Sequence, residues 1–136
     1  MRFLIYICVI ILSSGCSLRF SEEAYSQAIS AKVNGLKLME SSTEPFDLHQ
    51  KKVENYKHEL LLAYEYAKGR GKRNRYAIEQ WRVINAEDGG SITEWLVRWE
   101  NRGSFELKTI ELFQPIFSDH FDQLIELEHH KTILDF

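Results

Sequence analysis

The stretch DLHQKKVENYKHELLLAYEYAKG, residues 47–69, decides the fold class of this chain. Its apolar side chains recur at intervals of three and four residues, which places them on one face of an α-helix. Asp47 and Gln50 have the spacing of a capping box and predict where the helix begins, and Gly69 predicts where it ends. The residues on the predicted buried face are Val53, Tyr56, Leu60, Ala63, Tyr64 and Ala67.

The segment upstream predicts another helix, with Ser21 as its N-cap and two carboxylates in its first turn. Asn34 and Gly35 allow an alternative, because Asn-Gly is a typical β-hairpin turn. The helix is favoured, since the apolar stripe keeps its phase through this pair and no neighbouring strands are predicted that could complete a sheet. The stripe consists of Tyr25, Ala28, Ile29, Val33, Leu36 and Met39.

Two helical segments are predicted between Gly69 and Gly103. The first is short and ends at EDGG, residues 87–90. The second begins at Ser91, which has capping-box spacing to Glu94, and ends at Gly103. Their apolar positions are Ile78, Trp81 and Ile84 in the first, and Ile92, Trp95, Leu96 and Trp99 in the second.

The last helical region is predicted to begin at Ser104. Pro115 lies inside it and removes one backbone donor, which predicts a kink or a break near Gln114. Its apolar positions are Leu107, Ile110, Phe113, Phe117, Phe121, Leu124 and Leu127.

Short connections between helices favour antiparallel neighbours. Residues 21–136 are therefore expected to form one all-α domain, a compact bundle of five or six antiparallel helices. The tryptophans and other aromatic residues are expected to fill its core, and an alternative is that they line a pocket between helices.

The first residues of the chain predict a targeting segment. Arg2 supplies a positive charge, and residues 3–12 form an uncharged apolar run of ten residues. A helix that spans a membrane needs about 20 such residues, so this run has the length of a signal-peptide core. Small residues follow at positions 13–15, and then comes Cys16.

This arrangement resembles the bacterial lipoprotein signal, the lipobox. The resemblance implies cleavage between Gly15 and Cys16, a diacylglycerol thioether on the Cys16 thiol and an acylated new amino group. Ser13 stands where the commonest residue of the family is leucine. Residues 1–15 would then be the cleaved signal peptide and residues 16–20 a lipidated tether. The alternative is an ordinary secretory signal in which Cys16 has no role.

The residue after the cysteine bears on the location of the protein. In lipoproteins an aspartate at this position retains the protein in the inner membrane, whereas this chain has Ser17. The resemblance therefore implies the outer membrane, facing the periplasm, or the outer face of the plasma membrane in a single-membrane bacterium.

The charge balance and the cysteine content argue against two classes of protein, nucleic-acid binders and disulfide-stabilised domains. The chain has 17 basic and 20 acidic residues, a balance that argues against a protein built to bind nucleic acid. Its second cysteine, Cys8, lies in the predicted signal peptide, so no disulfide is expected in the domain.

The segment KGRGKRNR, residues 68–75, gathers the candidate contacts to an anionic surface, which could be lipid headgroups or an acidic partner. The favoured alternative is that Lys68 and Arg70 complement the end of the preceding helix while the other charges are solvated. The candidate residues are Arg70, Lys72, Arg73 and Arg75.

Catalytic and metal-binding patterns are weak. His120 is flanked by Asp119 and Asp122, and Glu126 precedes His130 by one helical turn, but no HxxxH or HExxH spacing is present. Paired acids, Glu126 and Glu128 among them, are expected in exposed positions. We predict no catalytic residue, no metal site and no cofactor.

These observations favour a lipid-anchored, non-enzymatic envelope protein that binds another protein or has a structural role. The alternative is a periplasmic binding module for a small apolar ligand or lipid. An enzyme acting on the cell wall has only the expected location in its favour.

Overall fold

The computed structural model describes residues 19–86 and 89–131, and these form an all-α bundle. The predicted fold class is confirmed. The elements are α2 (Glu22–Ser41), the 3₁₀ turn η1 (Phe46–Leu48), α3 (Gln50–Gly69), the 3₁₀ turn η2 (Lys72–Asn74), α4 (Arg75–Asn85), α5 (Ser91–Arg102) and α6 (Leu107–His130).

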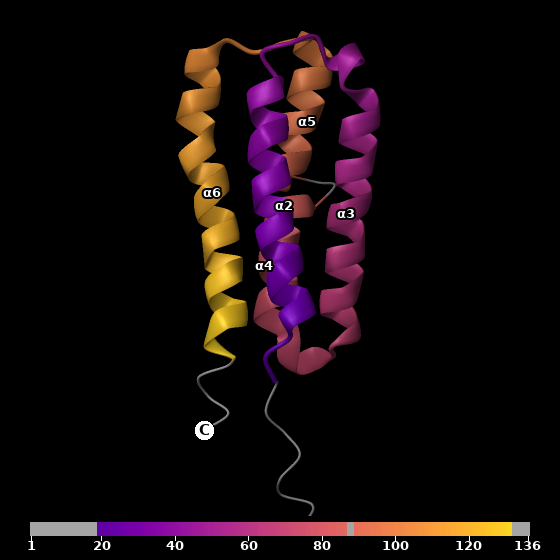
Figure 1. Cartoon of the computed structure of the whole chain (residues 1–136), viewed down its shortest axis with the longest axis vertical. Coiled ribbons are helices and arrows are strands. Elements are labelled where there is room, and N and C mark those ends of the chain that lie inside the picture. The colour runs from indigo at the N-terminus through magenta and orange to yellow at the C-terminus, as the bar shows by residue number, and fades with distance from the viewer. Residues whose placement is uncertain (1–18, 87–88, 132–136) are drawn as a thin grey trace, which may run out of the picture.

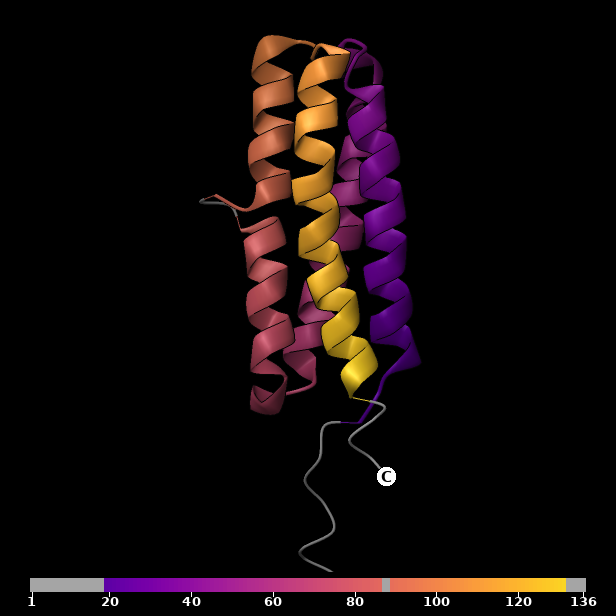
Figure 2. The ribbon, with the colours of Figure 1, turned by 90° about the vertical axis from the view of Figure 1, so that its left-hand side faces the viewer.

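The five helices of the described chain are arranged as four columns, because two of them share one column (Figure 1). Three columns are the long helices α2, α3 and α6. Helices α4 and α5 run in the same direction, one above the other, and together make the fourth column (Figure 2). Neighbouring columns are antiparallel, so the architecture is an up-down-up-down four-helix bundle whose third column is interrupted.

Helix α2 continues through Asn34 and Gly35, so the helix is confirmed over the hairpin. Its predicted stripe is correct at Ala28 and Met39, which are buried, and wrong at Ile29 and Val33, which are 38% and 43% exposed. Most of the residues that face the core are small. The buried residues are Ala24, Ala28, Ala31, Gly35, Leu38 and Met39.

Gly35 explains why this face carries small residues. A Cβ atom added at Gly35 would lie 2.2 Å from Tyr56 Oη and 2.4 Å from Phe117 Cζ. The backbone of α2 thus lies directly against rings of α3 and α6, and only a residue without a side chain fits there.

Three helix starts differ in how they are capped. Ser21 caps α2 as predicted, since its Oγ accepts from the backbone N–H of Ala24 at 3.1 Å. Asp47 does not cap α3, which begins only at Gln50; Asp47 lies in η1 and accepts from the Gln50 side chain at 3.3 Å. Ser91 is the first residue of α5 and its side chain does not cap the helix, so that capping box is also wrong.

Loop packing accounts for the later start of α3. Phe46 is buried against Trp99, with ring centroids 5.2 Å apart, and its backbone N–H donates to Gly103 O at 2.8 Å. The N–H of Phe105 donates to Ser42 O at 2.8 Å, so two loops pair at this end of the bundle. Residues 46–48 are held in the 3₁₀ turn by these contacts.

Helix α6 starts at Leu107, three residues after the predicted Ser104, and is continuous through Pro115. Of the predicted kink or break near Gln114, the break is therefore wrong. Pro115 lies on the exposed side of the helix. There the carbonyl that loses its helical partner can bond to water, which keeps the cost of the proline low.

Aromatic residues fill the core, as expected. Trp81 packs edge-on against Phe121, with ring centroids 6.2 Å apart. Trp95 packs on Phe105 at 4.2 Å, and Trp99 lies against Phe46. Each tryptophan is at most 5% exposed, so most of each ring packs against other rings, although an edge of Trp81 and an edge of Trp95 each line a surface groove.

Tyr56 gives a pH prediction. Its hydroxyl donates to Ala31 O at 2.8 Å, and burial, with a smaller contribution from Glu59, raises its pKa well above the usual value near 10. The unfolded chain loses this proton near pH 10 while the folded chain keeps it, so the free energy of unfolding should fall above that pH. The loss is up to about 1.4 kcal/mol per pH unit.

Urea unfolding at pH 8 and pH 11 measures this loss. Between these two values, the wild type should lose more stability than Tyr56→Phe. Equal losses in the two proteins would contradict the prediction.

Candidate functional site at the entry end of the bundle

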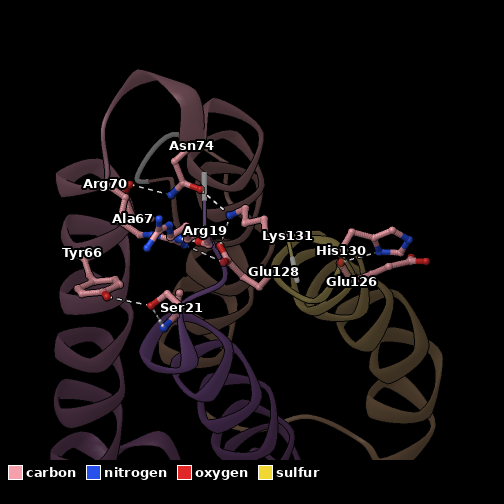
Figure 3. A network of polar contacts seen from close by, with 11 residues as sticks. Arg19, Ser21, Tyr66, Ala67, Arg70, Asn74, Glu126, Glu128, His130 and Lys131 are labelled. Atoms are coloured by element: carbon pink, nitrogen blue, oxygen red, sulfur yellow. Dashed lines mark hydrogen bonds and ion pairs between the residues drawn. The ribbon is translucent and has the colours of Figure 1, made fainter. Parts of the chain in front are cut away.

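The described chain begins at Arg19, whose carbonyl accepts from Arg70 at the end of α3. We call this end of the bundle, where α3 and α6 end and α4 begins, the entry end. A polar network occupies it (Figure 3). At its centre is Glu128 of α6, which is 1% exposed. Arg70 donates to Glu128 Oε2 at 2.8 Å, and Lys131 donates to Oε1 at 2.7 Å. Both carboxylate oxygens are therefore paired with cations.

Asn74 extends the network to the end of α3. Its Oδ1 accepts from Lys131 Nζ at 2.6 Å, and its Nδ2 donates to Ala67 O at 2.8 Å. The buried Asn74 amide thus satisfies a carbonyl in the last turn of α3, which the helix itself leaves without a partner. Burial lowers the pKa of Lys131 and nearby Arg70 adds to this, while Glu128 acts in the opposite direction.

The first described residues are attached to the same network. Arg70 also donates to the backbone carbonyl of Arg19. Ser21 Oγ and Tyr66 Oη are hydrogen-bonded at 2.9 Å, and the Phe20 ring lies 5.8 Å from that of Tyr25. One guanidinium therefore joins the start of the described chain to the buried carboxylate of α6.

The candidate basic residues separate into two groups. Arg70 is 13% exposed and paired with Glu128, so it does not belong to a free cationic surface, the less favoured of the two interpretations of this segment. Lys72 and Arg73 are exposed in η2. Arg75 is exposed at the start of α4, and its guanidinium lies 4.7 Å from the centroid of the Tyr76 ring. Lys68 pairs with Glu65 at 2.6 Å.

The expectation of an exposed Glu128 is wrong. This residue follows Phe121 and Leu124 at helical spacing on the buried face of α6, and this phase was the signal that could have indicated its burial. Its neighbour Glu126 is exposed, as expected.

The histidine pairs suggested by the sequence do not form. His120 Nδ1 lies 3.1 Å from Ser91 Oγ, and Asp122 instead pairs with Lys32. His130 Nδ1 contacts the backbone carbonyl of Glu126 and not its carboxylate.

A different histidine pair was missed. His49 is buried against Trp99, and its Nε2 lies 2.6 Å from Glu44 Oε2. Trp99 Nε1 donates to Glu44 O at 3.0 Å, which holds this loop residue in place. No sequence spacing marks the pair, because Glu44 and His49 lie on either side of η1 and meet only through loop packing.

Within residues 19–86 and 89–131, no three histidine, cysteine, aspartate or glutamate side chains converge in a way that could hold a metal ion. Among the helices that the structure describes, none is long and apolar enough to cross a membrane. Gly15 and Cys16, the predicted cleavage and lipidation residues, lie outside the described residues. No family model, no curated protein and no solved structure matches the chain.

Proposed function

We propose that this chain is a lipid-anchored, non-enzymatic protein of the bacterial envelope whose helical bundle binds a protein partner, on the outer membrane and facing the periplasm. In a single-membrane bacterium the location would be the outer face of the plasma membrane. The observation that carries the anchor is the uncharged apolar run followed by Ser13, Ser14, Gly15 and Cys16. Cys16 precedes Arg19 by three residues, which span at most about 10 Å, and the Arg19 carbonyl accepts from Arg70 at the entry end.

This short separation would orient the bundle. With Cys16 acylated, the entry end would face the membrane, and Lys72 and Arg75 would lie near the lipid headgroups. The paired loops at residues 42–49 and 103–106 would point away from the membrane. An anchor with two or more acyl chains holds firmly without help from basic residues, so these cations would orient the domain more than retain it.

A protein partner is supported by apolar side chains that the bundle leaves exposed. Val83 of α4 and Phe113 and Ile116 of α6 are exposed and line a groove of about 300 Å³ together with Trp95. Exposed apolar side chains that gather at a groove are typical of protein contacts. The alternative of a small-ligand binder with a site in the aromatic interior has less support, since the tryptophans pack against other rings.

The anchor is tested by Cys16→Ala in the full chain, expressed in a bacterial host that is fed an alkyne-labelled fatty acid. Wild type should incorporate the label and remain with membranes after a carbonate wash. The variant should lose the label and the shift in mobility that cleavage produces.

Cys8→Ala is the matched control, because Cys8 is the other cysteine and lies in the predicted signal peptide. It should be labelled like the wild type. Labelling of Cys16→Ala, or an unlabelled wild type, would overturn the proposed anchor.

A further inference from the structure

A groove of about 720 Å³ lies between α3 on one side and the end of α4 with Thr93 of α5 on the other. Leu61 and Tyr64 of α3 form one side, and Trp81 and Ala86 form the other. Leu61 is 48% exposed although it faces this groove, so part of its apolar surface has no protein partner. The volume lies within the range of small-molecule sites.

Among its described residues, the groove is lined by two basic side chains, Lys57 and Arg82, and by two neutral polar ones, Asn85 and Thr93. Both basic groups can donate to an anion at the rim of the groove. Arg82 is paired with Glu79, whose Oε2 lies 3.2 Å from Arg82 Nη1 in an ion pair exposed on both sides. Such an exposed pair contributes little, so an anion can compete for Arg82.

We propose that this groove binds a single-chain anionic amphiphile, a fatty-acid carboxylate. The alkyl chain would cover Leu61 and the ring edges of Tyr64 and Trp81. The carboxylate would accept from Lys57 or Arg82 at the rim, where water still reaches the charges. This site is distinct from the aromatic interior and does not depend on the proposed anchor.

Equilibrium dialysis with radiolabelled dodecanoate, below its micelle concentration, tests the site. The protein is the full chain carrying Cys16→Ala, so that no attached acyl group competes for the groove. One saturable site is expected. Butyrate has the carboxylate without the long alkyl chain, and dodecyl maltoside has the alkyl chain without the charge. Both should bind at least about tenfold more weakly than dodecanoate.

Substitutions test whether dodecanoate binds in the groove or on another apolar surface of the protein. Leu61→Ser and the double variant Lys57→Gln/Arg82→Gln should each weaken dodecanoate binding about tenfold. Glu79→Gln should strengthen it two- to threefold, roughly the effect of removing one exposed competing charge. A merely unfolded variant would not bind more tightly, so this gain keeps the test independent of stability.

The matched controls lie on the same helix. Leu62→Ser changes the neighbouring exposed leucine, and Lys51→Gln changes an exposed lysine outside the groove. Both should bind dodecanoate like the parent chain. The proposal fails if dodecanoate shows no saturable binding, if the groove variants bind as their controls do, or if dodecyl maltoside binds as tightly as dodecanoate.

Discussion

Replacing Gly35 with alanine is expected to lower the free energy of unfolding by about 2–3 kcal/mol, although alanine is the better helix former by about 1 kcal/mol. The new Cβ would lie 2.2 Å from Tyr56 Oη and 2.4 Å from Phe117 Cζ. Both rings are buried, so neither can turn into solvent. Forcing them apart costs about 1–3 kcal/mol, and displacing Tyr56 also strains its hydrogen bond to Ala31 O.

Urea unfolding followed by circular dichroism measures this effect, with Gly69→Ala as the control. Gly69 ends α3, and a Cβ there meets nothing within 4 Å. Its substitution should change stability by less than about 0.5 kcal/mol, or raise it slightly. Removing the Tyr56 hydroxyl in Gly35→Ala/Tyr56→Phe should recover part of the loss. Equal stability of Gly35→Ala and Gly69→Ala would show that α2 can move away from the rings at no cost.

Replacing Glu128 with alanine is expected to cost about 3 kcal/mol, the lower end of the range for breaking a buried ion pair. It leaves Arg70 and Lys131, at 13% and 14% side-chain exposure, close together without a carboxylate. Both cations lie at an end of the bundle and can turn toward water, which limits the loss. Glu128→Gln should be destabilised too, because it retains the shape but not the charge.

Glu126→Ala is the matched control, two residues away on the same helix with its side chain exposed. It should unfold at the same urea concentration as the wild type. Replacing all three charged residues by methionine should recover most of the stability, since the unpaired charges are then removed together. If Glu128→Ala differs from Glu126→Ala by less than about 0.5 kcal/mol, the network does not stabilise the fold.

The helices were predictable wherever large apolar residues mark the buried face. In α5 the stripe is correct at every position, because Ile92, Trp95, Leu96 and Trp99 are all buried. In α2 the same logic was correct at Ala28 and Met39 but missed Ala24, Ala31 and Gly35. Large rings of α3 and α6 approach this helix, so the complementary residues are small, and a pattern based on hydrophobicity alone favours Ile29 and Val33 instead.

The polar groups were harder to predict, because their partners are distant in sequence. Arg70 and Glu128 are 58 residues apart, and Lys131 meets Asn74 across 57. The charge run at residues 68–75 was visible, but which of its members is paired depends on how the end of α6 packs beside it. The groove beside Leu61 was not predicted either, since its lining comes from three helices that the sequence alone does not place relative to one another.

The break between α4 and α5 in the third column divides the bundle along its axis into two halves, which we call levels. Trp81 of α4 packs with Phe121 in the half nearest the entry end, and Trp99 of α5 packs with Phe46 in the other half. Helices α2, α3 and α6 pass through both levels, whereas α4 and α5 each belong to one. The ladder of helical hydrogen bonds stops between them, so α5 can fray or detach as a local unit while α4 retains its order. Amide exchange is therefore expected to be faster in α5 than in α4 at equal burial.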